Sequence, residues 1–195
     1  MNHQLHNISQ TLAGLPCRWG FCGGWAIDLF LGRQTRSHQD IDVAVFRRDQ
    51  SLIHSHLIHL GWSFQKVVDG KGMPWSASEF IQLPCHEIRC HNPSSDPPKF
   101  EMLLNESDET KFVFRRDYSI MLPLDRAISQ TPSGLAVLAP EIVLLYKAKD
   151  AGSAKNASDL QNVRDHLDAA ARQWLVEGLK KVQPGHPWLG TLAGD

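Results

Sequence analysis

The sequence predicts a mixed α/β fold, in which a mixed β-sheet with flanking helices forms a core that is followed by a helical C-terminal part. Segments with strand-like alternation and segments with helical spacing of apolar residues are intermixed up to about residue 139. From Pro140 onward, apolar residues recur at helical spacing. Because 195 residues suit one domain or a core with an appendage, we expect a core over residues 1–139 and a helical part over 140–195 packed on it.

Composition and charge exclude several classes of protein. The chain is 42% hydrophobic and 21% charged, as globular proteins usually are. A formal net charge of −1 argues against tight non-specific binding of nucleic acid, which needs a basic surface. There is no membrane-spanning run, and the start MNHQLHNISQ lacks the pattern of a signal peptide. We therefore expect a cytoplasmic protein whose four cysteines are reduced.

The N-terminal part predicts a helix, a strand, a helix and a strand. Leu5, Ile8 and Leu12 recur at helical spacing before Gly14. The next expected elements are a strand over 18–22, a helix over 25–31 that is capped by Gly32, a polar loop over 33–39 and a strand over 40–46. Asp28 lies on the second helix and is interpreted as a hydrogen-bond anchor.

The remaining elements follow from the same two periodicities. Asp49 is expected to cap a helix that carries Leu52, Ile53, His56, Leu57 and Leu60 on one face and ends at Gly61. Strands are expected over 62–68, 87–91, 100–105, 111–115 and 135–138, with a hairpin turn at 69–72. Helices are expected over 141–149, with Pro140 as first residue, and over 157–167 and 169–182.

Two carboxylates lie at the start of the strand over 40–46. Side chains alternate across a strand, so Asp40 and Asp42 share one face while Ile41, Val43 and Val45 share the other. Carboxylates about 7 Å apart along a strand can converge on Mg²⁺, which prefers oxygen ligands. Two such ions can hold the attacking and leaving oxygens of a phosphoryl displacement. A solvated Asp-x-Asp pair is the simpler alternative.

Gly23 and Gly24 lie between an expected strand and an expected helix. Glycines there let the backbone approach a phosphate closely, and the helix N-terminus supplies free N–H donors. We therefore expect Gly23 and Gly24 to bind a triphosphate, with a plain tight turn as the alternative.

These motifs together resemble a known family. The pieces that carry the resemblance are Gly23–Asp28, Gly32, Thr35–Arg36, His38, Asp40–Asp42, Lys99–Leu104, Leu138–Lys147 and His186–Leu189. The ordered set is similar to the small antibiotic nucleotidyltransferases, which are lincosamide and aminoglycoside adenylyltransferase-like proteins of the DNA-polymerase-beta-type nucleotidyltransferase superfamily. The resemblance spans most of the chain.

The resemblance implies a Mg²⁺-dependent enzyme that moves a nucleoside monophosphate, AMP from ATP or its equivalent from another NTP, onto a hydroxyl of a small molecule. An aminoglycoside or lincosamide antibiotic is the implied acceptor. The family's third acid falls in the expected strand over 100–105, so Glu101 joins Asp40 and Asp42 as a catalytic and metal-binding residue, with two Mg²⁺ ions expected. Glu87, Glu106 and Asp108 are the alternatives to Glu101.

Basic residues are expected to neutralise the triphosphate and its leaving pyrophosphate. Lys147 falls where the resembling proteins carry a lysine near the nucleotide, and Arg36 and His38 precede the acidic strand. A cation favoured at a helix C-terminus is the alternative for Lys147, and a surface histidine is the alternative for His38. Asn156 stands where the family pattern has an acid.

Two other functions stay open at this point. One is a toxin–antitoxin type nucleotidyltransferase that modifies RNA or protein, against which the near-neutral charge counts. The other is a nucleotide-binding module without catalysis, against which the three retained acids count. The sequence does not decide between a monomer and a homodimer.

Overall fold

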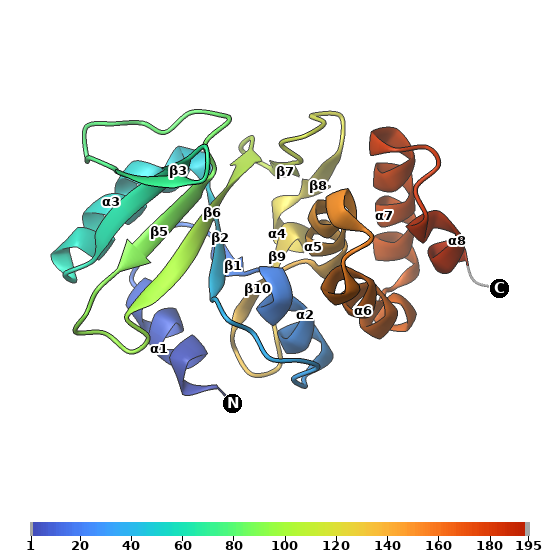
Figure 1. The fold of residues 1–195 in the computed structure, drawn as a ribbon, viewed down its shortest axis with the longest axis horizontal. Coiled ribbons are helices and arrows are strands. Elements are labelled where there is room, and N and C mark those ends of the chain that lie inside the picture. Colours follow the sequence, from blue (N-terminus) through green and yellow to red (C-terminus); the bar gives the residue numbers. More distant parts are fainter. Residues whose placement is uncertain (1, 194–195) are drawn as a thin grey trace.

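The computed structural model describes residues 2–193, which form one mixed sheet with helices on both faces (Figure 1). The strands are β1 (Trp19–Phe21), β2 (Asp42–Phe46), β3 (Ser63–Val68), β4 (Lys71–Pro74), β5 (Glu87–His91), β6 (Lys99–Ser107), β7 (Lys111–Val113), β8 (Met121–Pro123), β9 (Ile128–Gln130) and β10 (Ala136–Leu138). The helices are α1 (His3–Leu12), α2 (Gly23–Leu31), α3 (Gln50–His59), α4 (Leu124–Ala127), α5 (Pro140–Lys147), α6 (Ala154–Val163), α7 (Ala169–Val182) and α8 (Trp188–Ala193).

The sheet has the strand order β4-β3-β5-β6-β2-β1-β10-β9, and β7 and β8 extend it from the far end of β6. The pairs β2–β6 and β1–β10 are parallel, and the other pairs are antiparallel. The predicted mixed α/β class is therefore confirmed. No helix within residues 2–193 is long and apolar enough to cross a membrane.

Two hydrophobic cores lie on opposite faces of the sheet. Helices α1 and α3 cover one face, and α2 with α5, α6, α7 and α8 covers the other (Figure 1). The central strand β2 contributes to both, because Val43 and Val45 enter the first core while Ala44 and Phe46 enter the second. The alternation that was predicted for this strand is confirmed, and it fixes Asp42 on the face of α2 and α5.

The structure corrects three local predictions. Strand β2 begins at Asp42, so Asp40 lies in the bend before it, and Gly23 and Gly24 form the first turn of α2. In α3 the predicted apolar face is wrong, since Leu52 and Leu60 are 43% and 48% exposed. The buried face of α3 instead carries Gln50, Ile53, His54 and Leu57, which follow the i, i+3, i+4, i+7 spacing.

Several short elements were not predicted. These are β4, β8, α4, β9 and α8, which contain three to six residues each, and β4 begins inside the turn that was expected over 69–72. The predicted helix over 157–167 is α6, which starts and ends earlier and continues as a 3-10 turn over Arg164–His166. The C-terminal helices α5 and α7 have the predicted positions within two residues.

Candidate active site

Three carboxylates lie on the sheet face that α2 and α5 cover. Asp42 at the start of β2 is directly opposite Glu101 of the parallel neighbour β6. On the other side of β6, strand β5 places Glu87 opposite Leu103, which packs against the core of this face. Because residues two apart on a strand share a face, Asp42, Glu101 and Glu87 all point to this side of the sheet.

A cavity of about 350 Å³ lies against these carboxylates. It is lined by Asp42, Glu87 and Glu101, by Gly23 at the start of α2 and by Lys147 at the end of α5. The other charged or aromatic residues of its wall are His86, Arg115, Arg116 and Tyr146. The structure therefore brings together four of the predicted site residues, namely Asp42, Glu101, Gly23 and Lys147.

Asp40 lies outside this cavity. Its side chain is 54% exposed, and its Oδ1 atom is 3.9 Å from Nζ of Lys99. Asp40 and Glu101 both line a second cavity of about 450 Å³, which also contacts Gln4 of α1 and Phe100 of the opposite core. Glu101 thus borders both cavities at the edge where β2 and β6 begin.

Basic residues of the protein compensate the negative charge of the acid cluster only in part, since Arg89 lies 3.3 Å from Oε1 of Glu87 and 3.8 Å from Oε1 of Glu101. Burial raises the pKa of Asp42 to about 6, and the charges of Asp40 and Glu87 add to the increase, although Lys147 opposes it. Burial, followed by the charges of Glu87, Asp42 and Asp40, raises the pKa of Glu101 to about 7, although Arg89 opposes the increase. Burial and the proximity of other carboxylates both disfavour the charged form of a carboxyl group.

The carboxylates fit a divalent cation in their donor chemistry and their electrostatics. Mg²⁺ takes carboxylate oxygens, and a bound cation would remove the repulsion that raises both pKa values. Among residues 2–193, no group of three or more His, Cys, Asp or Glu side chains is already gathered around one ion position. Binding would therefore require the carboxylates of Asp42, Glu101 and Asp40 or Glu87 to draw together.

The glycine pair permits a close approach between α2 and the acidic strand. Gly23 has φ 62°, and a Cβ atom on it would lie 2.1 Å from Oδ2 of Asp42. A Cβ atom on Gly24 would lie 2.4 Å from Nη2 of Arg36 and 2.4 Å from Nδ1 of His38. The backbone N–H of Cys22 also donates to the carbonyl of Asp42 at 2.8 Å. Glycine is thus required here by side chains of the protein itself.

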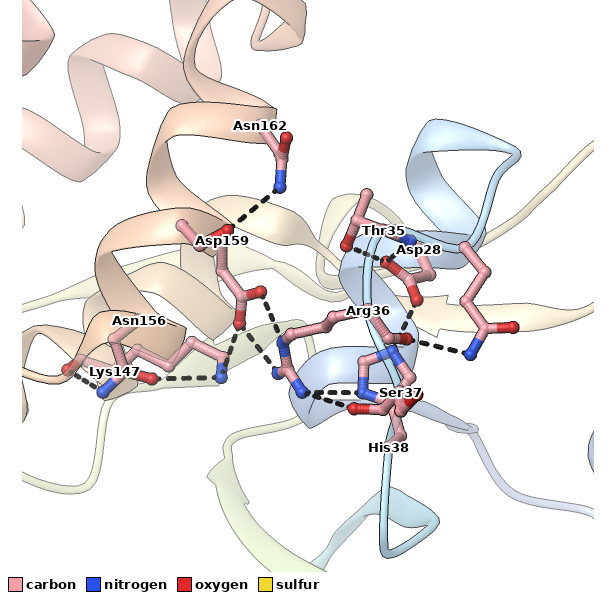
Figure 2. Close-up of polar contacts among 11 residues, drawn as sticks. Asp28, Thr35, Arg36, Ser37, His38, Lys147, Asn156, Asp159 and Asn162 are labelled. Atoms are coloured by element: carbon pink, nitrogen blue, oxygen red, sulfur yellow. Dashed lines mark hydrogen bonds and ion pairs between the residues drawn. The ribbon is translucent and has the colours of Figure 1, made fainter.

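Arg36 and Lys147 share a buried carboxylate, Asp159 of α6 (Figure 2). Arg36 donates through Nε and Nη2 to the two Asp159 oxygens at 3.1 Å each, and Lys147 Nζ is 2.9 Å from Oδ2. The Asp159 side chain is 1% exposed. Lys147 also donates to Oδ1 of Asn156 at 3.3 Å. Both cations that were predicted to meet phosphate are therefore already paired.

His38 is buried against Asp28 in the same region (Figure 2). Because arginine only donates, Nδ1 of His38 accepts from Nη1 of Arg36 at 3.0 Å. Nε2 of His38 then carries the hydrogen and donates to Asp28 at 2.5 Å. Asp28 also accepts from the N–H and hydroxyl of Thr35. Asp28 therefore anchors the loop that leads to the acidic strand, as expected.

The sequence profile described as aminoglycoside-2''-adenylyltransferase matches residues 4–118, which is more than half of the chain. The chain belongs to this family. The matched range contains α1 to β7 and all three carboxylates of the cavity. As a member of the aminoglycoside-2''-adenylyltransferase family, the chain is an enzyme of the nucleotidyltransferase class, as its resemblance to antibiotic nucleotidyltransferases implied.

Solved structures share the fold. The antibiotic-resistance factor ANT(2'')-Ia is 14% identical, with a TM-score of 0.62 and coverage of 93% of this chain and 92% of that one. Its complex with adenylyl-2''-tobramycin gives 14% identity, a TM-score of 0.62 and coverage of 92% and 97%. The lincomycin-bound lincosamide antibiotic adenylyltransferase LnuA is 14% identical, with a TM-score of 0.58 and coverage of 86% of this chain and 98% of that one. No curated protein sequence matches the chain.

The structure of this family member adds residues that the sequence did not single out. Asp159 lies 123 residues from Arg36, so no local pattern connects the two. Arg115 and Arg116 follow β7 and reach the cavity because β7 folds back on the far end of β6. The adjacent arginines were a visible signal, but the sequence did not show that this turn returns to the acidic strands.

Proposed function

We propose that this enzyme transfers AMP from ATP onto a hydroxyl of an aminoglycoside-like or lincosamide-like antibiotic, with Mg²⁺ as the required ion. The observation that carries the proposal is the cluster of Asp42, Glu101 and Glu87 on one cavity wall beside the first turn of α2. It occurs in a chain of an adenylyltransferase family. Structural neighbours that were solved with adenylyl-2''-tobramycin and with lincomycin support the acceptor class.

In this reaction the acceptor hydroxyl oxygen forms a bond to the α-phosphorus, and the bond from that phosphorus to the β-phosphate oxygen breaks. Pyrophosphate leaves with the electron pair, and a carboxylate accepts the hydroxyl proton. Glu101 suits this role, because it lines both cavities and so lies where a nucleotide in one would meet an acceptor in the other. The protein contributes chiefly by positioning the reactants and stabilising charge.

Asp42 and Glu101, joined by Asp40, are the residues that would hold the magnesium. When bound, Mg²⁺ supplies charge neutralisation at the phosphates and promotes ionisation of the acceptor hydroxyl. Because the described side chains do not yet converge, we expect the ion to bind together with the nucleotide, whose phosphates complete its oxygen ligands.

Some of the residues that we propose for nucleotide binding contact the nucleotide directly, and others hold the contacting residues in place. Gly23 and Gly24 offer the free N–H groups of the first turn of α2 to the phosphates, and Lys147 at the end of α5 lines the same cavity. Arg36 and His38 lie behind Gly24, so they act on the nucleotide by holding this turn and its loop in place. These assignments make Lys147 the direct phosphate contact of the three basic residues.

The experiment uses the purified chain with α-labelled ATP, Mg²⁺ and separate acceptors: an aminoglycoside, lincomycin, tRNA and total protein. We expect labelled antibiotic and released pyrophosphate. Asp42→Asn should lower the rate at least about 10²-fold, since it removes a charge from the reacting centre. Asp69→Asn, in the β3–β4 turn, is the matched control.

Each other outcome changes the conclusion. Label on tRNA or protein alone would favour the macromolecular acceptor. Nucleotide binding without turnover would indicate an inactive binding module. Near-normal turnover by Asp42→Asn would refute the assignment of this carboxylate.

A further inference from the structure

We propose that Arg115 and Arg116, in the turn after β7, bind the β- and γ-phosphates of the nucleotide and stabilise the pyrophosphate as it leaves. The inference rests on the proposed nucleotidyl transfer and assigns the anion-binding residues of that reaction. Both arginines line the cavity that contains Asp42 and Glu101. The cavity thus has an acidic wall on the sheet and a basic wall on this turn.

Within residues 2–193, neither Arg115 nor Arg116 has a carboxylate partner. By contrast, Arg36 and Lys147 are held by Asp159. The neighbouring Asp117 is engaged elsewhere, because its Oδ1 accepts from the backbone N–H of Ser119 at 2.9 Å. The uncommitted cations of the cavity are therefore these two arginines, and not the basic residues that the sequence indicated.

Both guanidinium groups pack on the ring of Tyr146. The guanidinium carbon of Arg115 lies 4.5 Å from the ring centre of Tyr146, and that of Arg116 lies 5.4 Å from the same ring. Nη1 of Arg116 also donates to the carbonyl of Tyr146 at 3.0 Å. Partial burial, followed by the charge of Arg115, lowers the pKa of Arg116. Two adjacent positive charges without a counter-ion favour the binding of an anion.

The turn that carries the arginines is fixed by backbone hydrogen bonds. The N–H of Phe114 donates to the carbonyl of Ile120 at 2.9 Å, and the N–H of Asp117 donates to that of Phe114 at 3.0 Å. The pair is therefore positioned before a ligand binds, which reduces the entropy lost on binding. Guanidinium groups form bidentate bonds with phosphate oxygens, so two of them match a diphosphate.

The charge of the leaving group explains why two arginines at this position would favour the reaction. As the bond between the α-phosphorus and the bridging oxygen breaks, negative charge moves onto the departing pyrophosphate. N–H groups that are fixed at that position form hydrogen bonds that strengthen as negative charge develops on the pyrophosphate. They then stabilise the transition state more than the bound substrate. Arg115 and Arg116 would then affect both nucleotide affinity and turnover.

The test measures binding of inorganic pyrophosphate, ATP and AMP, each with Mg²⁺, to the full chain by titration calorimetry. Arg115→Gln and Arg116→Gln should each weaken pyrophosphate and ATP binding by about tenfold or more, as loss of a charge-assisted bond implies. AMP affinity should change by less than about threefold, because AMP lacks both terminal phosphates. Arg33→Gln, at an exposed arginine after α2, is the matched control.

A conservative variant separates this role from a structural one. Arg115→Lys keeps the charge but not the bidentate geometry, so it should retain the fold by circular dichroism and show an intermediate loss of pyrophosphate affinity. Product inhibition by pyrophosphate should weaken in the same order as direct binding. If the arginine were purely structural, its substitution would change the affinities for pyrophosphate and AMP to the same degree.

The outcomes distinguish this inference from the proposed function. Unchanged pyrophosphate binding in Arg115→Gln and Arg116→Gln, alongside transfer by the wild type, overturns the arginine assignment alone. Arginine-dependent pyrophosphate binding by a wild type that transfers no nucleotide supports the anion site and overturns the proposed reaction. A wild type that binds neither pyrophosphate nor ATP overturns both.

Discussion

Gly23 holds the closest contact between α2 and the acidic strand, and a substitution there should act directly on Asp42. A Cβ atom would lie 2.1 Å from Oδ2 of Asp42, and φ 62° is a conformation that costs other residues about 1–2 kcal/mol. We expect Gly23→Ala to displace Asp42, to reduce nucleotidyl transfer at least about tenfold and to lower the melting temperature by several degrees.

Gly70 provides the matched control for this prediction. It has φ 76°, yet nothing lies within 4 Å of its Cβ position. Gly70→Ala should therefore show the backbone strain without the loss of transfer. Equal activity of the two alanine variants, measured at equal concentrations of folded protein, would contradict the role given to Gly23.

The acid cluster should make the fold less stable at alkaline pH. The pKa values of Asp42 and Glu101 in the folded state, about 6 and about 7, exceed their ordinary values of 3.8 and 4.5. The folded state then binds more protons than the unfolded state, so stability falls as the pH rises from about 4 through 7. Asp42→Asn should be more stable than the wild type at pH 8, by about 1–2 kcal/mol after solvent screening is considered.

Urea unfolding at pH 8 and at pH 4 measures the difference in stability between Asp42→Asn and the wild type. This difference should become small at the lower pH, because the carboxyls of the folded wild type are then mostly protonated. Mg²⁺ together with ATP at pH 8 should raise the stability of the wild type and leave that of Asp42→Asn nearly unchanged. If both proteins respond equally to Mg²⁺ and ATP, Asp42 does not contribute to an ion site.

At the scale of elements, α6 connects the loop before β2 to the end of α5. Its Asp159 is fully buried, and it pairs with Arg36 of the loop and Lys147 of α5. Asp159→Asn would leave two poorly exposed cations without their counter-charge, which costs about 3 kcal/mol or more. We expect a lower free energy of unfolding and weaker nucleotide binding, both measurable on the same preparation.

Asp165 is a suitable control for Asp159, because its side chain is 71% exposed and its pairing with Arg164 is long, at 3.5 Å. Asp165→Asn should change the stability by less than about 0.5 kcal/mol. A similar small effect of Asp159→Asn would show that the buried pairings do not hold the loop.

The elements themselves were predictable to different degrees. Longer ones such as α7 and β6 carry enough residues for a period to appear, and both were predicted close to their observed positions. Strands β8 and β9 contain three residues each, which is too few for a period, and they form because partners elsewhere in the chain pair with them. In α3, Leu52 and Leu60 misled the prediction, since Gln50 is buried through bonds to Ile81 that no periodicity reveals.

The candidate site was predictable where it depends on one strand. Alternation put Asp42 on the face opposite to Val43, whereas Glu101 was expected from the family resemblance, and β6 brings it opposite Asp42. Pairings between distant segments were not predictable, and these decide which cations are free: Asp159 occupies Arg36 and Lys147, while Arg115 and Arg116 stay uncommitted. Local sequence thus indicated part of the acidic half, but not that Asp40 lies outside the cavity, and the basic half required the tertiary fold.

At the scale of the whole molecule, the helical part and the sheet share one hydrophobic core. Ala44 and Phe46 of β2 belong to the same cluster as Leu144 of α5 and Leu175 of α7. We propose that residues 1–139 and 140–195 are not independent folding units. A chain that ends at Ala139 should therefore lack a cooperative thermal transition and should bind a hydrophobic dye, because one sheet face would be exposed.

The full chain should unfold in a single transition, and Leu175→Ala should lower its stability by about 2–5 kcal/mol without splitting that transition. Calorimetry provides both measurements. A cooperative transition in the chain that ends at Ala139 would establish an autonomous core and contradict the shared-core interpretation.

The position of Glu101 at the border of both cavities has a consequence for the order in which the two substrates bind. One cavity contacts α1 and the other contacts α2 and α5, and Glu101 lines both. A nucleotide bound in one cavity and an acceptor bound in the other would meet at this carboxylate, so the two would bind in either order.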